Sequence, residues 1–153
     1  MNLIADKLRN ISYFLQQDED SFVYFSDIID EFAPLKVSFS LTKDFLLEEN
    51  YIRFISCAIQ DICRLWEKII FSSKFNQKGA LILDKNIRSV TSAFSDASSL
   101  IVRSLFTRLL QISNALNAET LDDLNALVKE DLLLSQSDLK LISDLRVDLK
   151  NLK

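Results

Sequence analysis

The sequence predicts an all-α protein, a helical bundle of about five to seven helices. Apolar residues recur every three or four positions along most of the chain, which is the period of an amphipathic helix. No second alternating segment with hairpin signals is present to form a sheet. Hydrophobic residues make up 48% of the 153 residues and eleven are phenylalanine, so the chain can bury a core and is not a disordered segment.

The first two predicted helices are separated by an acidic corner. Helical spacing over residues 4–15 predicts a helix that ends at the acidic residues 18–20. The spacing resumes over 22–32, and we expect this second helix to stop at Pro34, because proline lacks a backbone N–H and disfavours helix at the residue before it. Residues 35–41 alternate apolar and polar side chains, but a lone strand has no partner, so an extended crossing or a poorly patterned helix is expected.

The clearest predicted helix follows Thr42, a candidate N-cap. One narrow face of this helix carries six apolar residues, namely Ile52, Ile55, Ile59, Ile62, Trp66 and Ile69. The face is either the core of a bundle or the seam of a coiled coil with another protein, and core is favoured because few heptads are present. Cys57 and Cys63 lie about 9 Å apart along the same helix. That separation is too long for a disulfide, so both are expected to be free thiols.

Gly79 is the only glycine in the chain, and we expect it at a turn between two helices, where it can take a positive φ. The apolar run 80–83 is expected to pack as part of the connection, and Asp84 to cap the next helix. Apolar residues then keep helical spacing over 87–116. This spacing predicts one long helix or two helices joined near Asp96.

Two further helix starts are predicted near the carboxyl end. Thr120 is followed three residues later by Asp123, and Ser135 by Asp138, which places a hydroxyl cap and a first-turn carboxylate at each start. These caps predict a short helix over 121–127 and a final helix over 139–149.

The charge pattern excludes several classes of partner. Eighteen basic and twenty-two acidic residues give a net charge of −4 and a pI near 4.9, with no basic run to follow a phosphate backbone, so no nucleic-acid partner is expected. Charged residues interrupt the first ten positions, where a signal peptide needs an apolar stretch, and also every later apolar run. We therefore expect a protein that is in the cytosol or faces it.

No residues of a catalytic site are recognisable. The chain has no histidine, no glycine-rich phosphate loop and no thiol beside a base. The adjacent carboxylates 48–49 and 122–123 point in different directions on a helix, and the acidic residues 18–20 lack the spacing and glycine of a calcium loop. We expect no enzyme activity, no cofactor and no metal.

Three ordered blocks of sequence resemble a known family. KIIFSSKFNQKGALILDKNIRSV, IVRSLFTRLLQISNALNAET and SDLKLISDLRVDLKNL are similar, in this order, to the carboxyl-terminal region of subunit 4 of the conserved oligomeric Golgi complex. The resemblance covers roughly residues 60–152. It implies a helical-rod subunit of a vesicle tether. Residues 1–76 are then the end of the rod, packed on a carboxyl-terminal domain of residues 77–153. Together the two parts are expected to form one compact unit, a fragment of a longer subunit.

The resemblance also implies a function. It indicates a non-catalytic structural and interaction module that supports retrograde transport within the Golgi and the retention of glycosylation enzymes. The implied partners are other subunits of the tether, with SNAREs or associated trafficking proteins as further candidates. The implied location is the cytosolic face of the Golgi membrane, with peripheral association. The alternative is a free-standing helical adaptor or regulator that binds a partner helix in a groove.

Five residues are candidates for interactions. On a helical wheel Arg108 lies at the edge of the apolar face, where its methylenes can pack while the guanidinium reaches sideways. If the last helix folds back, Asp138 can form a partly shielded ion pair with it. A solvated Arg108 is the equally favoured alternative. Arg88, Arg103 and Arg146 are candidates for surface contacts.

Overall fold

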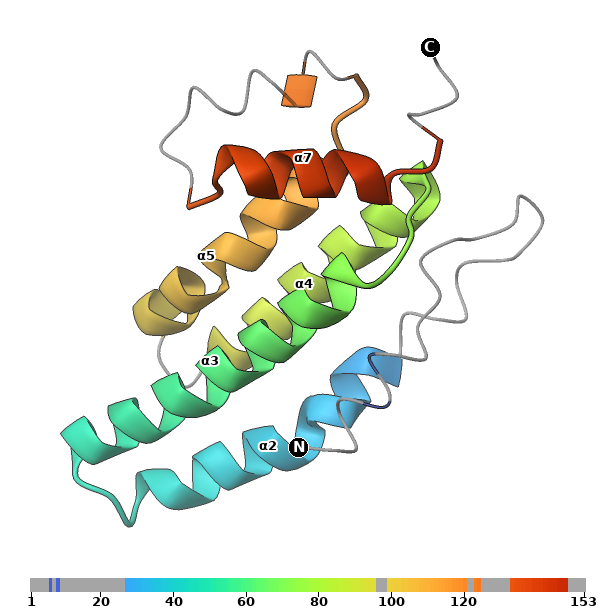
Figure 1. The fold of residues 1–153 in the computed structure, drawn as a ribbon. Helices are drawn as coiled ribbons and strands as arrows, with labels where there is room; N and C mark the ends of the chain where they lie inside the picture. The colour runs from blue at the N-terminus through green and yellow to red at the C-terminus, as the bar shows by residue number, and fades with distance from the viewer. Residues whose placement is uncertain are drawn as a thin grey trace.

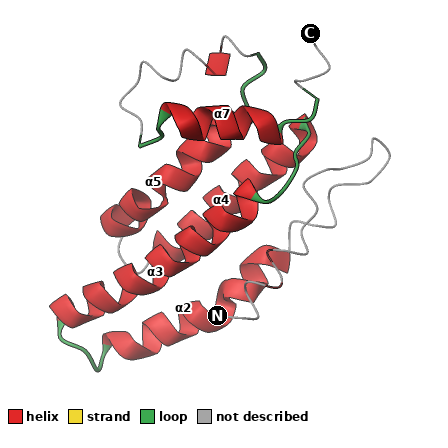
Figure 2. Ribbon diagram, viewed as in Figure 1, coloured by secondary structure: helices red, strands yellow, loops and turns green. Residues whose placement is uncertain are grey.

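The computed structural model of the chain describes residues 6, 8, 27–95, 99–120, 123–124 and 133–148. Within these ranges the chain forms five α-helices and no strand, as Figures 1 and 2 show. The helices are α2 (Asp27–Lys43), α3 (Glu48–Phe71), α4 (Gln77–Ser95), α5 (Ser99–Leu116) and α7 (Gln136–Leu145). The predicted all-α helical bundle is confirmed.

The helices α3, α4 and α5 form the centre of the bundle. α4 packs most extensively against α5, α3 also packs against α5, and α2 lies against α3 and α4. α7 lies across one end, in contact with α5 and α3, whereas the turn between α2 and α3 lies at the opposite end (Figure 1). No described helix has an apolar stretch long enough to cross a bilayer.

The apolar face predicted for α3 lies in the core. Its buried members are Ile55, Ile59, Ile62, Trp66 and Ile69, whereas Ile52 is partly exposed. Phe32 of α2 packs on this face, with its ring centroid 6.4 Å from that of Trp66 and 5.7 Å from that of Phe94 in α4. The face therefore serves as the bundle core and not as an exposed seam.

The predicted helix stop at Pro34 is wrong. Pro34 lies inside α2, which continues to Lys43 and includes residues 35–41. A proline here removes one i→i−4 hydrogen bond, but Phe32 and Phe39 on either side of it are fully buried against the neighbouring helices. Their tertiary packing outweighs the local preference. Residues 35–41 thus form the poorly patterned helix, one of the two conformations that their sequence allows.

The predicted cap at Thr42 is also wrong. Thr42 belongs to the last turn of α2, where its hydroxyl donates to the Ser38 carbonyl at 2.8 Å. α3 begins later, after Leu47, which makes no side-chain cap. The hydroxyl of Thr42 is used within its own helix, so it is not available to the next one.

The turn predicted at Gly79 lies a few residues earlier. α4 already begins at Gln77, no described glycine has a positive φ, and Gly79 is buried in the first turn. The amide oxygen of Asn76 accepts from the Gly79 N–H at 2.9 Å, so Asn76 caps α4. The run 80–83 is therefore helical, and Asp84 is not a cap but lies in the middle of α4, since the connection from α3 already ends at Asn76.

Other predictions fall on or beside residues outside the described ranges. These are the helix over 4–15, the corner at 18–20 and most of the helix over 121–127. The predicted end of the final helix at residue 149 is wrong, because α7 ends at Leu145 and Arg146 is extended. The segment 87–116 is divided between α4 and α5. Both carboxyl-terminal caps are confirmed: Thr120 and Asp123 exchange backbone and side-chain hydrogen bonds of 3.0 and 3.1 Å, and Ser135 and Asp138 form a complete capping box.

Candidate functional site

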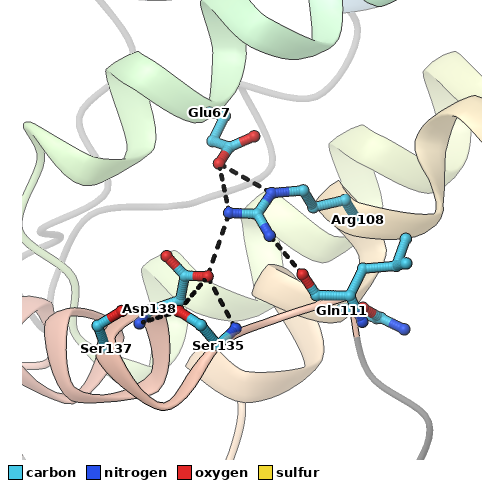
Figure 3. Close-up of polar contacts among 7 residues, drawn as sticks. Glu67, Arg108, Gln111, Ser135, Ser137 and Asp138 are labelled. Carbon is cyan, nitrogen blue, oxygen red and sulfur yellow. Dashed lines mark hydrogen bonds and ion pairs between the residues drawn. The ribbon is translucent and has the colours of Figure 1, made fainter.

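The guanidinium of Arg108 joins three helices. Arg108 projects from α5, and its Nε and Nη2 atoms donate to Glu67 Oε1 of α3 at 3.0 and 2.9 Å. Nη2 also lies 3.3 Å from Asp138 Oδ2 in the first turn of α7. Figure 3 shows the guanidinium between the two carboxylates. The exposed fraction of the three side chains is 33%, 25% and 20%, so the cluster is partly shielded from water.

The same cluster fixes the segment that enters α7. Arg108 Nη1 donates to the Leu133 carbonyl at 2.6 Å, and Gln111, one turn later on α5, accepts from the Leu133 N–H at 2.8 Å. α5 thus binds both backbone groups of Leu133. Asp138 Oδ2 accepts from the Ser135 N–H at 2.9 Å while it faces Arg108, so one carboxylate both caps α7 and anchors it to α5.

The charges of the cluster stabilise each other. The hydrogen bond to Glu67 raises the pKa of Arg108 above its ordinary value, and the nearby Asp138 charge adds to this effect. Hydrogen bonds from the Ser135 backbone, the Ser135 hydroxyl and Arg108 hold the pKa of Asp138 below its ordinary value, against an opposing effect of burial. Both groups are therefore fully ionised at neutral pH.

Arg146 lies in the interior and not at the surface, where the sequence placed it. Its side chain is 3% exposed. Its Nη1 donates to the carbonyls of Leu116, the last residue of α5, and of Ala118, just beyond the helix. Its Nε and Nη2 donate to the carboxylate of Asp148 at 2.8 and 3.2 Å. The last carbonyls of a helix have no donor within the helix, so the guanidinium of Arg146 is buried here because it supplies donors to them.

Asp148 extends the Arg146 cluster to the start of α4. Its Oδ2 accepts from the Gln77 N–H at 2.9 Å, one of the amides that the first turn of α4 leaves unbonded. Phe75 adds a short parallel bridge, donating to the Leu145 carbonyl and accepting from Val147, both at 3.0 Å. Burial acts to raise the pKa of Asp148, but the hydrogen bond and charge of Arg146 outweigh it and hold this pKa below its ordinary value.

The chain is similar to one protein family over most of its length. The model of the family described as conserved oligomeric Golgi complex subunit 4, C-terminal, matches residues 1–142. The chain belongs to this family. The match includes the Arg108 cluster, whereas Arg146 and Asp148 lie beyond its end.

Three relatives carry the family's name. The Drosophila melanogaster subunit 4 is 29% identical over 132 residues, which is 82% of this chain and 16% of the relative. The Arabidopsis thaliana subunit is 33% identical over 79 residues, covering 52% of this chain and 11% of the relative. The Caenorhabditis elegans subunit is 31% identical over 78 residues, covering 51% and 10%. The chain therefore spans a minor part of the length of these relatives.

Two of the predicted arginines do lie at the surface. Arg88 has an exposed fraction of 60% and pairs with Asp84 one turn earlier on α4 at 2.7 Å. Arg103 is exposed on α5, and it forms no ion pair with any other residue in the described part of the chain. Arg88 is thus partly engaged within its own helix, and Arg103 presents a charge to the surroundings.

Sequence reasoning identified Asp138 but missed Glu67, the other acidic partner of Arg108, and Asp148, the acidic partner of Arg146. Glu67 lies one residue after Trp66 of the buried face, so its position at the edge of that face was a usable signal. Asp148 had no comparable signal. Arg146 and Asp148 meet because the chain leaves its helix at Leu145, which periodicity does not reveal.

The two cysteines differ in their exposure, since Cys57 is exposed and Cys63 is partly buried. Both are free, as predicted. Burial, with a smaller contribution from the charge of Glu67, raises the pKa of Cys63 to about 12, so this thiol stays protonated at neutral pH. Within the described ranges no group of three or more potential ligands could hold a metal ion.

Proposed function

We propose that this chain is a non-catalytic structural and interaction module within a subunit of a Golgi vesicle-tethering complex. The observation that carries the proposal is the family match over residues 1–142. In this role the module supports retrograde transport within the Golgi and so the retention of glycosylation enzymes. Its partners are the other subunits of the tether, with SNAREs or associated trafficking proteins as further candidates, and its place is the cytosolic face of the Golgi membrane.

The polar clusters support a rigid scaffold. Arg108 binds α5 to α3 and α7, and Arg146 with Asp148 ties the carboxyl-terminal segment to α4 and α5. In both clusters, the charged side chains connect different secondary-structure elements. Polar networks whose members are hydrogen-bonded make a fold rigid, as a module that holds partners at defined positions requires.

We also propose that residues 1–76 and 77–153 act as one unit. α2 and α3 come from the first part, and they pack against α4 and α5 of the second. The family match favours this tether module over a free-standing helical adaptor that binds a partner helix in a groove, because it links the chain to a subunit of an oligomeric complex.

A chimera tests the proposal. In Drosophila cells that lack their own subunit 4, the matching region of the fly subunit is replaced by this chain, and surface glycans are measured by lectin binding. We expect the chimera to restore normal glycans and the Golgi location of glycosylation enzymes. A chimera with Arg108→Leu should restore them poorly, whereas Arg103→Leu on the same helix is the matched control and should behave like the unchanged chimera.

Two results would count against the tethering role. One is normal lectin binding in cells whose fly subunit has lost this region altogether. The other is a well-folded chimera that reaches normal levels and yet restores neither glycans nor enzyme location.

A further inference from the structure

The turn between α2 and α3 projects apolar side chains into solvent. Phe45 and Leu47 are 86% and 77% exposed, and the acidic residues Asp44, Glu48 and Glu49 around them are exposed as well. We call residues 44–49 the tip. Exposed apolar side chains that are grouped together and surrounded by polar residues are typical of an interaction site.

A small hollow lies directly beside the tip. It has a volume of about 230 Å³ and is lined by Lys36, Phe39, Ser40, Lys43, Tyr51, Ala93 and Phe94. Aromatic rings form much of the lining, and two lysines contribute the positive charge. The volume is below the roughly 300 Å³ at which small-molecule pockets begin, so the hollow suits a single inserted side chain better than a free ligand.

The tip and the hollow are complementary in both charge and polarity. The tip offers an apolar ring between carboxylates, and the hollow offers an aromatic lining with lysines. The tip cannot fold back into its own hollow, because it is held as the short connection between two long helices. The tip of a second copy has the apolar ring and the flanking carboxylates that match this lining.

We propose that this end of the molecule is a contact between two copies of the chain, in which each copy inserts Phe45 into the hollow of the other. Because tip and hollow share one end of the bundle, a twofold axis brings both pairs together at once and closes the assembly as a dimer. The outer face of α2 extends the contact, since Val37 and Leu41 are 56% and 62% exposed on the helix that leads to the tip.

The contact is weak and depends on salt. Two tips and the outer α2 face of each copy form an interface at the low end of the size range, below about 1,200 Å², which is typical of transient association. We expect dissociation constants in the micromolar to millimolar range, as for other transient contacts. The carboxylates of the tip and Lys43 are exposed, so added salt screens their attraction and favours the monomer.

Sedimentation equilibrium of the complete chain over micromolar to near-millimolar concentrations measures the association. We expect a monomer–dimer equilibrium that Phe45→Ser weakens by about ten-fold or more, the effect of losing one buried aromatic anchor. Lys43→Glu should also weaken it, and Lys43→Glu combined with Glu48→Lys should recover a large part of the loss. Leu141→Ser is the matched control, since Leu141 is 53% exposed on α7 at the other end of the bundle and should leave the equilibrium unchanged.

Far-ultraviolet circular dichroism of each variant checks that the fold is kept, and all the substituted residues are exposed. A strictly monomeric wild-type chain at the highest concentration overturns the proposal, and so does a dimer that Phe45→Ser and Lys43→Glu leave unaffected. A monomer whose tip instead binds vesicles of neutral phospholipid also overturns it, in favour of a membrane contact. None of these results bears on glycan rescue by the chimera.

Discussion

Replacing Arg146 by leucine should destabilise the bundle by about 3 kcal/mol. The side chain is almost fully buried and makes hydrogen bonds to the Leu116 and Ala118 carbonyls and to Asp148. Leucine keeps most of the apolar volume but leaves these acceptors without their donor. Breaking a buried pair typically costs about 3–5 kcal/mol. We expect the lower end of this range, because Asp148 is 38% exposed and water can hydrate its carboxylate once the arginine is gone.

Urea denaturation followed by far-ultraviolet circular dichroism measures the free energy of unfolding of the wild type and the variant. Arg88→Leu is the control, because Arg88 is mostly exposed and its pair with Asp84 should contribute about 0.5 kcal/mol or less. If Arg146→Leu cost less than about 1 kcal/mol, close to the control, the buried cluster would not hold the carboxyl-terminal segment and the reasoning would be refuted.

Three further outcomes are expected. A double-mutant cycle at Arg108 and Asp138, measured by urea melts, should give a coupling energy of about 1–3 kcal/mol, between the values typical of exposed and of buried ion pairs. A coupling energy near zero would contradict a shielded pair. Folding lowers the pKa values of Asp138 and Asp148, so their contribution to stability is present above the ordinary pKa of 3.8 and is lost as the pH falls below it. Urea melts at decreasing pH should show this loss. The double variant Asp138→Asn with Asp148→Asn should have a weaker pH dependence of stability in this range. Iodoacetamide should label the exposed Cys57 quickly and the shielded, protonated Cys63 slowly, as mass spectrometry can follow, and equal rates would argue against the described packing of α3.

Periodicity predicted much of the bundle because the core faces of its helices repeat within each helix. Ile55, Ile59 and Ile62 mark the buried face of α3 from spacing alone, since residues three and four apart share one side of a helix. The caps at Thr120 and Ser135 were equally local, because each needs only a hydroxyl and a carboxylate three residues apart.

The errors had two causes, namely distant contacts that outweigh a local preference and a local cap that was overlooked. Pro34 lies inside α2 because Phe32 and Phe39 are buried against other helices, and a proline penalty is smaller than the loss of that packing. Gly79 needed no positive φ, since the capping side chain of Asn76 starts α4 before it. The helix through Pro34 depends on residues remote in the sequence, whereas the Asn76 cap is local and sequence reasoning overlooked it.

The sequence by itself determined the helical class, the resemblance to a family of Golgi tether subunits, and the position of Arg108 at the edge of an apolar face. Only the tertiary structure decided what the arginines do. Glu67 is 41 residues from Arg108, and Leu116 is 30 residues from Arg146. The strength of a charge pair depends on distance and on shielding from water, and folding sets both of these quantities by bringing remote segments together.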